Sequence, residues 1–144
     1  NYFSGYYSGY DNTSGSQNTF IGFQSGETGT PANANTTGSN NTFIGYNTGF
    51  PSPTQRNNAA AIGYNAKVDA DNALVLGGTG ADAVNVGIGT TSPAGNLEIS
   101  GSTPIFYLTR YSSDVSEPYI IFRKARGTSG TPSAVLSGDV LGQI

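Results

Sequence analysis

The phrase NTFIGFQSG at residues 18–26 recurs as NTFIGYNTG at residues 41–49, with three substitutions. A third copy, NYFSGYYSG, occupies residues 1–9. Looser copies follow, namely NAAAIGYNAK at 58–67, NALVLGG at 72–78 and NVGIG at 85–89. The copies begin, in steps of 17, 23, 17, 14 and 13 residues, at Asn1, Asn18, Asn41, Asn58, Asn72 and Asn85. Self-similarity at a short, recurring step is the signature of a repeat architecture.

Each copy combines an Asn, a short alternation of apolar and small residues, a Gly and a polar turn. We expect a strand of about four residues, with the Gly where the backbone bends or approaches a neighbour. The steps are too short for a βαβ unit, which needs about 30 residues. The pattern therefore predicts one coil of a β-solenoid per copy, stabilised by stacking, with Asn and Thr columns hydrogen-bonded along the stack.

The composition also indicates an all-β protein. Gly, Asn, Ser and Thr fill 67 of the 144 positions, and Leu, Ile, Val and Phe only 29, which is few for a conventional core. Disorder is disfavoured because charged residues are 10% of the chain and aromatic residues 11%.

The missing residue types exclude several kinds of function. The chain has no His and no Cys, which excludes thiolate zinc sites, disulfides and His-dependent catalytic triads. Six Lys and Arg residues and a net charge of -3 argue against nucleic acid as a partner. No apolar run reaches the roughly 18 residues of a membrane span, so we expect no membrane insertion. The sequence predicts a protein that is not an enzyme and carries no cofactor.

The repeated phrase no longer recurs after Pro93. We therefore divide the chain into a β-solenoid repeat region, residues 1–92, and a C-terminal β region, residues 93–144, which we expect to continue beyond the last residue. Apolar runs at 105–108 and 119–122 flank a polar segment and predict a β-hairpin. The basic residues Arg123, Lys124 and Arg126 form either a solvated strand end or a binding site for an anionic glycan or lipopolysaccharide phosphate.

Two stretches carry resemblances to known families. NNAAAIGYNAKVDADNALVLGG at 57–78 resembles the 14-residue repeats in the heads of trimeric autotransporter adhesins. NVGIGTTSPAGNLEISG at 85–101 and the segment 121–144 resemble phrases of bacteriophage tail-fibre and appendage proteins. The resemblance implies an intertwined homotrimer of left-handed, β-roll-like solenoid coils, followed by a β-hairpin or β-prism-like region. It also implies a place in the virion tail or on an extracellular surface, with other virion tail proteins and a host-surface glycan or protein as partners.

An apolar column fits the homotrimer. We expect it to contain one residue from each of five copies, and to be too narrow to exclude water in a monomer, so that trimerisation would bury it. Its members are Ile21, Ile44, Ile62, Val75 and Ile88.

One segment matches a metal-binding pattern. GGTGADAVN at 77–85 fits the nonapeptide of calcium-binding β-rolls, and Asp69, Asp71 and Asp82 lie near one coil apart as calcium candidates. The pattern occurs once, whereas calcium binding needs ligands from a second turn, so a structural turn is favoured over a metal site.

Tyrosines are the main candidates for binding. Tyr2, Tyr6, Tyr7 and Tyr10 gather in the first ten residues and offer flat apolar rings with a polar edge, which suit sugar rings. The competing interpretation is a structural ladder, because repeats place like residues in columns. The ladder positions are Tyr6, Phe23, Tyr46 and Tyr64.

The sequence thus predicts a structural and host-attachment segment of a trimeric viral tail fibre, in which weak contacts add through multivalency. The head of a bacterial trimeric surface adhesin is the alternative with the same physics. The alternative from another class is a polysaccharide-cleaving tailspike, which would use pairs of carboxylates.

Overall fold

The computed structural model describes residues 1–111, 113, 120, 125–128 and 131–134. Within these residues the protein is all-β, and most strands lie in parallel sheets. The strands, each of three residues, are β1 Tyr2–Ser4, β2 Thr19–Ile21, β3 Thr42–Ile44, β4 Ala60–Ile62, β5 Leu74–Leu76, β6 Val86–Ile88, β7 Leu97–Ile99, β8 Arg126–Thr128 and β9 Thr131–Ser133. Two 3-10 turns, η1 and η2, span Pro31–Asn33 and Gly80–Asp82. The predicted all-β class is confirmed.

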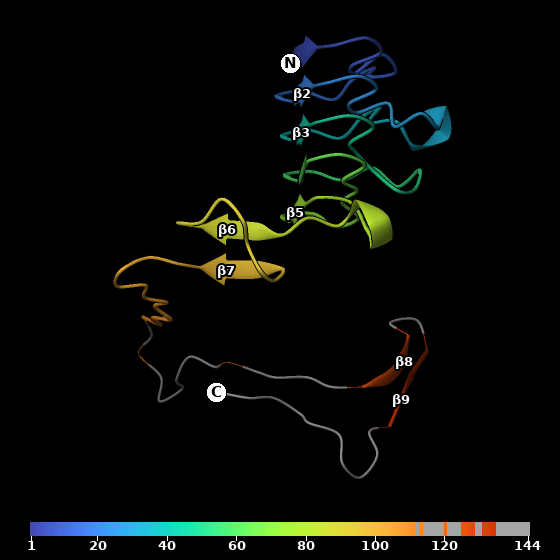
Figure 1. The fold of residues 1–144 in the computed structure, drawn as a ribbon. Coiled ribbons are helices and arrows are strands. Elements are labelled where there is room, and N and C mark those ends of the chain that lie inside the picture. Colours follow the sequence, from blue (N-terminus) through green and yellow to red (C-terminus); the bar gives the residue numbers. More distant parts are fainter. Residues whose placement is uncertain (112, 114–119, 121–124, 129–130, 135–144) are drawn as a thin grey trace. The chain divides into compact units, whose positions relative to one another are not determined.

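The first five strands form one parallel sheet in chain order, and Figure 1 shows them one above another. Successive strands pair in register and begin at residues 2, 19, 42, 60 and 74, so the steps are 17, 23, 18 and 14 residues. The longest step contains η1, and its excursion is closed at the base by a 2.7 Å hydrogen bond from the Asn35 N–H to the Gly26 carbonyl. The extra residues therefore leave the strand pairing unchanged. Below, repeats 1 to 4 are residues 1–17, 18–40, 41–58 and 59–72, and repeat 5 begins at residue 73.

The fourth repeat is aligned one residue later than its leading Asn suggests. Phe43 pairs with Ala61, and Ile44 with Ile62, so the partner of Asn41 is Ala59 and not Asn58. The apolar centre of the strand decides the register, because slipping by one residue would turn every side chain to the other face of the sheet.

The core is a column built from the middle residue of each strand. Phe3, Phe20 and Phe43 stack with ring centroids 4.8 Å apart at each step, and Ala61 and Val75 continue the column. Phe20, Phe43 and Ala61 are fully buried. The other members of the buried apolar cluster are Phe50, Ala59, Ala66 and Val68.

This alternation corrects the predicted apolar column in two places. Val75 belongs to the inner column, and its neighbour Leu76 is the residue in register with Ile62. Ile88 lies in β6, which pairs with β7 in a separate two-stranded parallel sheet. The prediction was wrong at these two residues because both lie three positions after their leading Asn, as Ile21 and Ile44 do, whereas backbone pairing fixes which side chains share a face.

A glycine column follows the strands. Gly5, Gly22, Gly45 and Gly63 have φ between +113° and +131°, a region that side chains with a Cβ rarely adopt. A Cβ on Gly22 would lie 2.4 Å from the carbonyl oxygen of Gly45. Glycine is required here both for the backbone conformation and for the close approach of one repeat to the next.

The chain divides into two compact units, Asn1–Pro104 and Ile105–Ile144. The first unit extends past Pro93, since the β6–β7 pair lies on both sides of it. In the second unit, β8 and β9 form an antiparallel pair. The predicted hairpin lies earlier, at 105–108 and 119–122: its first run carries no strand, and its second lies outside the described residues except for Ile120.

Candidate functional site

A ladder of asparagines links the first four repeats. The Asn1 Oδ1 accepts a hydrogen bond of 2.9 Å from the Asn18 N–H. In the same way, the Asn18 Oδ1 accepts a hydrogen bond of 2.8 Å from the Asn41 N–H. The Asn41 Oδ1 accepts a hydrogen bond of 2.9 Å from the Ala59 N–H. Each side chain thus bonds to the backbone of the repeat that follows it. The predicted Asn column is confirmed, and it ends at Ala59, where the fourth repeat has no Asn.

The side-chain amide groups of the same asparagines donate hydrogen bonds to loop residues inside the stack of repeats. Asn18 and Asn41 donate 2.8 Å hydrogen bonds to the carbonyls of Gly38 and Arg56, and Asn41 also donates to the Oδ1 of the buried Asn35. Among the described residues, every buried side-chain N or O atom has a hydrogen-bond partner. The polar interior therefore avoids the penalty of about 1–3 kcal/mol that each buried, unpaired polar group would impose.

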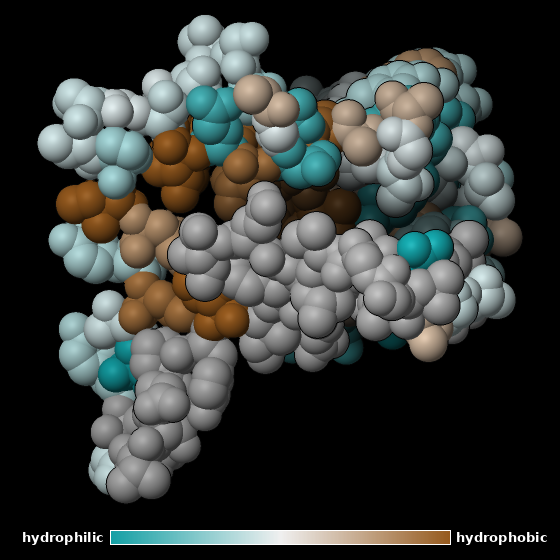
Figure 2. Space-filling model, turned by 60° about the horizontal axis from the view of Figure 1, so that its bottom comes forward, coloured by the Kyte–Doolittle hydropathy of each residue, from teal (hydrophilic) through white to brown (hydrophobic). Residues whose placement is uncertain are grey.

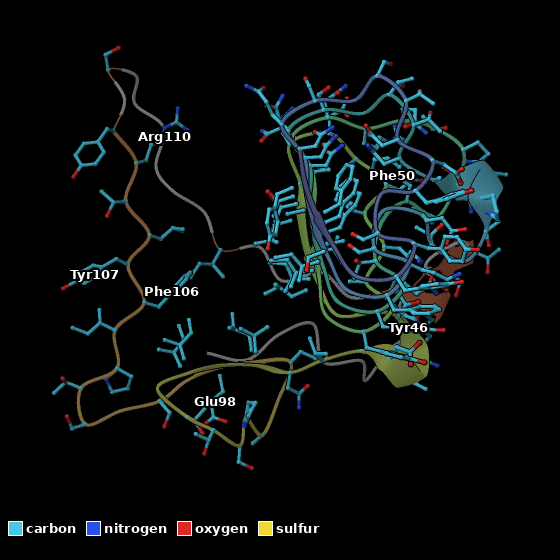
Figure 3. All side chains as sticks on the ribbon, turned by 90° about the horizontal axis from the view of Figure 1, so that it is seen from above. Tyr46, Phe50, Glu98, Phe106, Tyr107 and Arg110 are labelled. Atoms are coloured by element: carbon cyan, nitrogen blue, oxygen red, sulfur yellow. The ribbon has the colours of Figure 1, made fainter. Side chains whose placement is uncertain are left out.

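An aromatic ladder runs along the surface. Tyr6 stacks on Phe23, Phe23 on Tyr46 and Tyr46 on Tyr64, with ring centroids 5.4, 5.5 and 5.3 Å apart. The rings are 42–64% exposed, and Figure 3, viewed along the stack, shows Tyr46 at the outer margin while Phe50 lies inside the ring of backbone. The predicted ladder is confirmed. Its neighbours cover both faces of Phe23 and Tyr46, so those two rings offer only their edges.

A tyrosine cluster, defined as Tyr6, Tyr7 and Tyr10, lies at one end of this ladder. The ring of Tyr7 stands edge-on to Tyr6, at 4.3 Å and 68°, and to Tyr10, at 4.9 Å and 84°. Hydrogen bonding with Tyr6 raises the pKa of Tyr7 above its usual value. Tyr2, the fourth binding candidate, lies in β1 and is 60% exposed.

The outer face of the five-stranded sheet is apolar along most of its length. It is formed by the first and third residues of each strand, and the third residues after β1 are Ile21, Ile44, Ile62 and Leu76. Ile21 is 38%, Ile44 36% and Leu76 43% exposed, and Leu74 beside Leu76 is 61% exposed. Apolar side chains, in brown, reach the molecular surface in the view of Figure 2.

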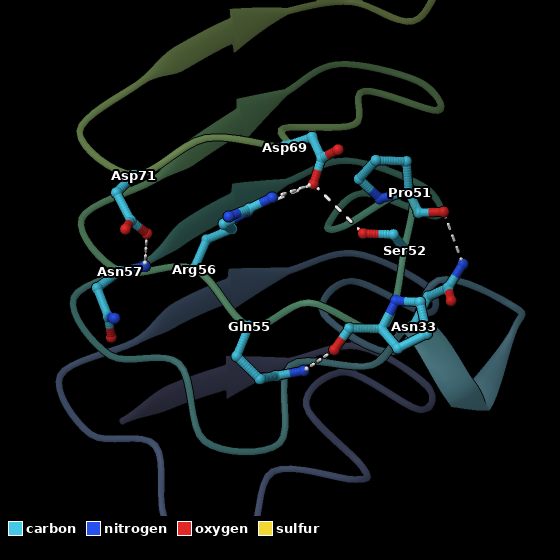
Figure 4. Close-up of polar contacts among 9 residues, drawn as sticks. Asn33, Pro51, Ser52, Gln55, Arg56, Asn57, Asp69 and Asp71 are labelled. Atoms are coloured by element: carbon cyan, nitrogen blue, oxygen red, sulfur yellow. Dashed lines mark hydrogen bonds and ion pairs between the residues drawn. The ribbon is translucent and has the colours of Figure 1, made fainter.

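The three calcium candidates bind different partners. Asp69 pairs with Arg56 at 2.9 Å and accepts a hydrogen bond from Ser52, while Asp71 accepts one of 2.7 Å from the Asn57 N–H (Figure 4). Asp82 accepts a 2.9 Å hydrogen bond from the Asn65 side chain. The structure does not bring the three carboxylates together, and in the described part of the chain no three acidic side chains form a metal-binding group.

Lys67 was missed by the sequence analysis. Burial lowers its pKa to about 8, and its Nζ donates to the backbone carbonyl and to the Oδ1 of Asn47. Lys67 pairs with Gly49 across a parallel bridge. The available signal was the alignment itself, since repeat 4 has Lys67 where repeats 1 to 3 have Gly9, Gly26 and Gly49.

The basic candidates lie in the second unit. Arg126 is the first residue of β8, and Arg123 and Lys124 lie outside the described residues. No helix among the described residues is long and apolar enough to cross a membrane. Comparisons with protein-family models, with curated proteins and with solved structures find no match to this chain. A proposal for the function of this protein therefore rests on the geometry and chemistry of its repeats.

Proposed function

We propose that the stacked repeats form a β-solenoid, that three copies of the chain assemble through its outer sheet face, and that this homotrimer is a segment of a virion tail fibre or similar extracellular fibre. The segment provides reach and attaches to a host surface. The observation that carries the proposal is the apolar stripe along the sheet, in which Ile21, Ile44 and Leu76 are exposed and Ile62 is half-buried.

The repeat geometry supports the proposed solenoid. Each repeat contributes one strand, and neighbouring repeats pair in parallel and in register. Contacts of this kind link each repeat only to the next, as in quasi-one-dimensional repeat proteins. Such a stack grows by adding repeats rather than by enlarging a core.

The apolar stripe supports self-association. It runs from β2 to β5 in a chain whose surface is otherwise rich in Asn, Ser and Thr, and contiguous exposed apolar surface marks interaction sites. A second copy presents a stripe of the same length and spacing, so it can match the stripe strand for strand. Copies related by rotation about an axis parallel to the stack bury the stripe in a closed ring.

The mass of the chain in solution tests the assembly. We expect three times the chain mass of 14.8 kDa by light scattering, and a monomer for Ile44→Asp, because a carboxylate in the buried stripe would be desolvated without a partner. Thr37→Asp is the matched control, since Thr37 is exposed and lies outside the strands. A monomeric wild-type chain with β circular dichroism would contradict the trimer.

The head of a bacterial trimeric adhesin is the second candidate, favoured by the 14-residue step between β4 and β5. The adhesin would form the same homotrimer, but on a bacterial cell surface instead of on a virion. Labelling with an antibody against this chain distinguishes the two: signal on virions supports the fibre, and signal on bacterial cells without virions supports the adhesin.

A further inference from the structure

Repeat 1 departs from the other repeats at several exposed positions. Tyr2 and Ser4 lie in β1, and the other two departures that matter here are tyrosines outside the strand. Tyr7 occupies the position of Gln24, Asn47 and Asn65. Tyr10 occupies the position of Glu27, Phe50 and Val68. The aromatic ladder needs only one ring per repeat, so it accounts for Tyr6 and leaves Tyr7 and Tyr10 unexplained.

Tyr7 has a left-handed backbone. Its φ is 55°, close to the 53°, 54° and 53° of Gln24, Asn47 and Asn65. Asn tolerates this region, whereas a bulky aromatic residue there is an outlier, and residues held in strained backbone cluster at ligand-binding and other functional sites. Repeat 1 therefore keeps a tyrosine at a position where the fold itself favours Asn.

Tyr10 is exposed where its counterparts are buried. Phe50 and Val68 are fully buried in the core, and Glu27 is 6% exposed, but Tyr10 is 70% exposed. The ring of Tyr10 thus adds little to the core and is presented to solvent beside Tyr7.

The tyrosine cluster forms an angular array of rings. Tyr6 is 64% and Tyr7 41% exposed, and Tyr7 stands nearly perpendicular to both neighbours. Tyr6 is stacked on Phe23 alone, and Tyr7 and Tyr10 contact other rings at an angle, whereas Phe23 and Tyr46 are each stacked between two rings. An open tyrosine face packs against the C–H face of a pyranose ring, and its hydroxyl edge forms hydrogen bonds with sugar hydroxyls.

The charged residues near the tyrosine cluster limit the classes of ligand that it can bind. The first 50 residues contain two charged side chains, Asp11 and Glu27, both acidic, and no Lys or Arg. The Lys67 amine reaches this part of the protein at Asn47, two repeats from Tyr7, where it is hydrogen-bonded. Repeats 1 and 2 therefore supply no cation of their own to neutralise phosphorylated or sialylated glycans or nucleic acids.

We propose that Tyr6, Tyr7 and Tyr10 form a binding site for an uncharged, pyranose-containing glycan. The proposal rests on the proposed function, because it names the surface ligand that an attachment fibre needs. Three copies per trimer would raise the strength of a shallow site through effective concentration.

The test is an array of oligosaccharides with terminal galactose, glucose or N-acetylhexosamine, with sialylated and phosphorylated oligosaccharides beside them. The best neutral binder is then titrated by tyrosine fluorescence, which reports directly because the chain has nine Tyr and no Trp. We expect saturable binding of a neutral glycan. Tyr7→Asn, which restores the residue of repeats 3 and 4, should weaken it at least tenfold while the melting temperature stays equal or rises.

Tyr64→Phe is the matched control, because it removes a hydroxyl from the far end of the ladder and should bind as the wild type does. Binding of no neutral glycan, a preference for the charged oligosaccharides, or unchanged affinity in Tyr7→Asn would overturn the site. Light scattering on the same samples separates the two proposals. A trimer without glycan binding overturns the site alone, and a monomer that binds a neutral glycan overturns the trimeric fibre alone.

Discussion

Phe20 and Phe43 stack in parallel inside the protein, with ring centroids 4.8 Å apart, an interplanar angle of 9° and no exposed surface on either ring. The two residues are 23 positions apart in sequence and occupy the same place in successive repeats. Their contact holds repeat 2 against repeat 3 across the longest step of the sheet. Stability thus depends on contacts between repeats, and the loss of one ring affects both of its neighbours.

Phe43→Ala should therefore strongly destabilise the protein. A Phe-to-Ala change in a core costs about 3–5 kcal/mol, and Phe43 contacts both Phe20 and the edge-on ring of Phe50. Urea unfolding followed by circular dichroism measures the loss. Phe23→Ala, in the exposed ladder, should destabilise the protein less, and an equal loss in the two variants would contradict the assignment of the core.

Gly45→Ala should disrupt the pairing of repeats 3 and 4. The new Cβ would lie 2.6 Å from the carbonyl oxygen of Gly63, and the backbone φ is +131°. We expect the free energy of unfolding to fall by more than about 1 kcal/mol, because the native backbone conformation is incompatible with alanine. The loss should be seen as a lower thermal midpoint. Gly95→Ala is the control, because nothing lies within 4 Å of its Cβ position. Equal midpoints for the two variants would show that the close approach is not required.

Asn41→Ala should remove the last link of the asparagine ladder. It would leave the Ala59 N–H, the Arg56 carbonyl and the Asn35 Oδ1 without their bonds to Asn41. Each buried unpaired group costs about 1–3 kcal/mol, so several kcal/mol should be lost in denaturant unfolding. The exposed Asn96→Ala should change stability by less than about 0.5 kcal/mol. A similarly small effect at Asn41 would contradict the role of the ladder.

Lys67 should make stability increase with pH. Burial lowers its pKa from 10.5 to about 8, so between these values the unfolded chain binds more protons than the folded one, and stability rises as pH rises. Unfolding in urea at pH 7.5, 8.5 and 9.5 measures the trend, and Lys67→Met should lose this part of it. Identical pH dependence in both proteins would contradict the desolvation of the Lys67 amine.

The sequence was sufficient for features that depend on like residues recurring in columns. The phrase shared by residues 18–26 and 41–49 predicted the repeated strands, the asparagine ladder and the stack of Tyr6, Phe23, Tyr46 and Tyr64. These predictions succeeded because parallel pairing in register brings equivalent residues to adjacent positions whatever the length of the loops between them.

Features that depend on aligning a repeat to within one residue were not predictable in the same way. Asn58 and Val75 were each assigned to a neighbouring column, because in repeats 4 and 5 small or aliphatic residues replace the phenylalanines that mark the inner face. The left-handed φ of Tyr7 and the lowered pKa of Lys67 depend on the folded backbone and on burial. For both, the only sequence signal was an unusual residue in an aligned position.

The closed excursion between Gly26 and Asn35 makes the width of a single repeat independent of the spacing between repeats. Parallel strands lie about 4.8 Å apart whatever connects them, and the 23-residue step pairs β2 with β3 in the same register as the 14-residue step pairs β4 with β5. Added residues therefore widen the stack of repeats locally without changing the spacing of its strands. Such loops can vary in length at fixed heights along the stack of strands, while the number of repeats alone determines how many strands the stack contains.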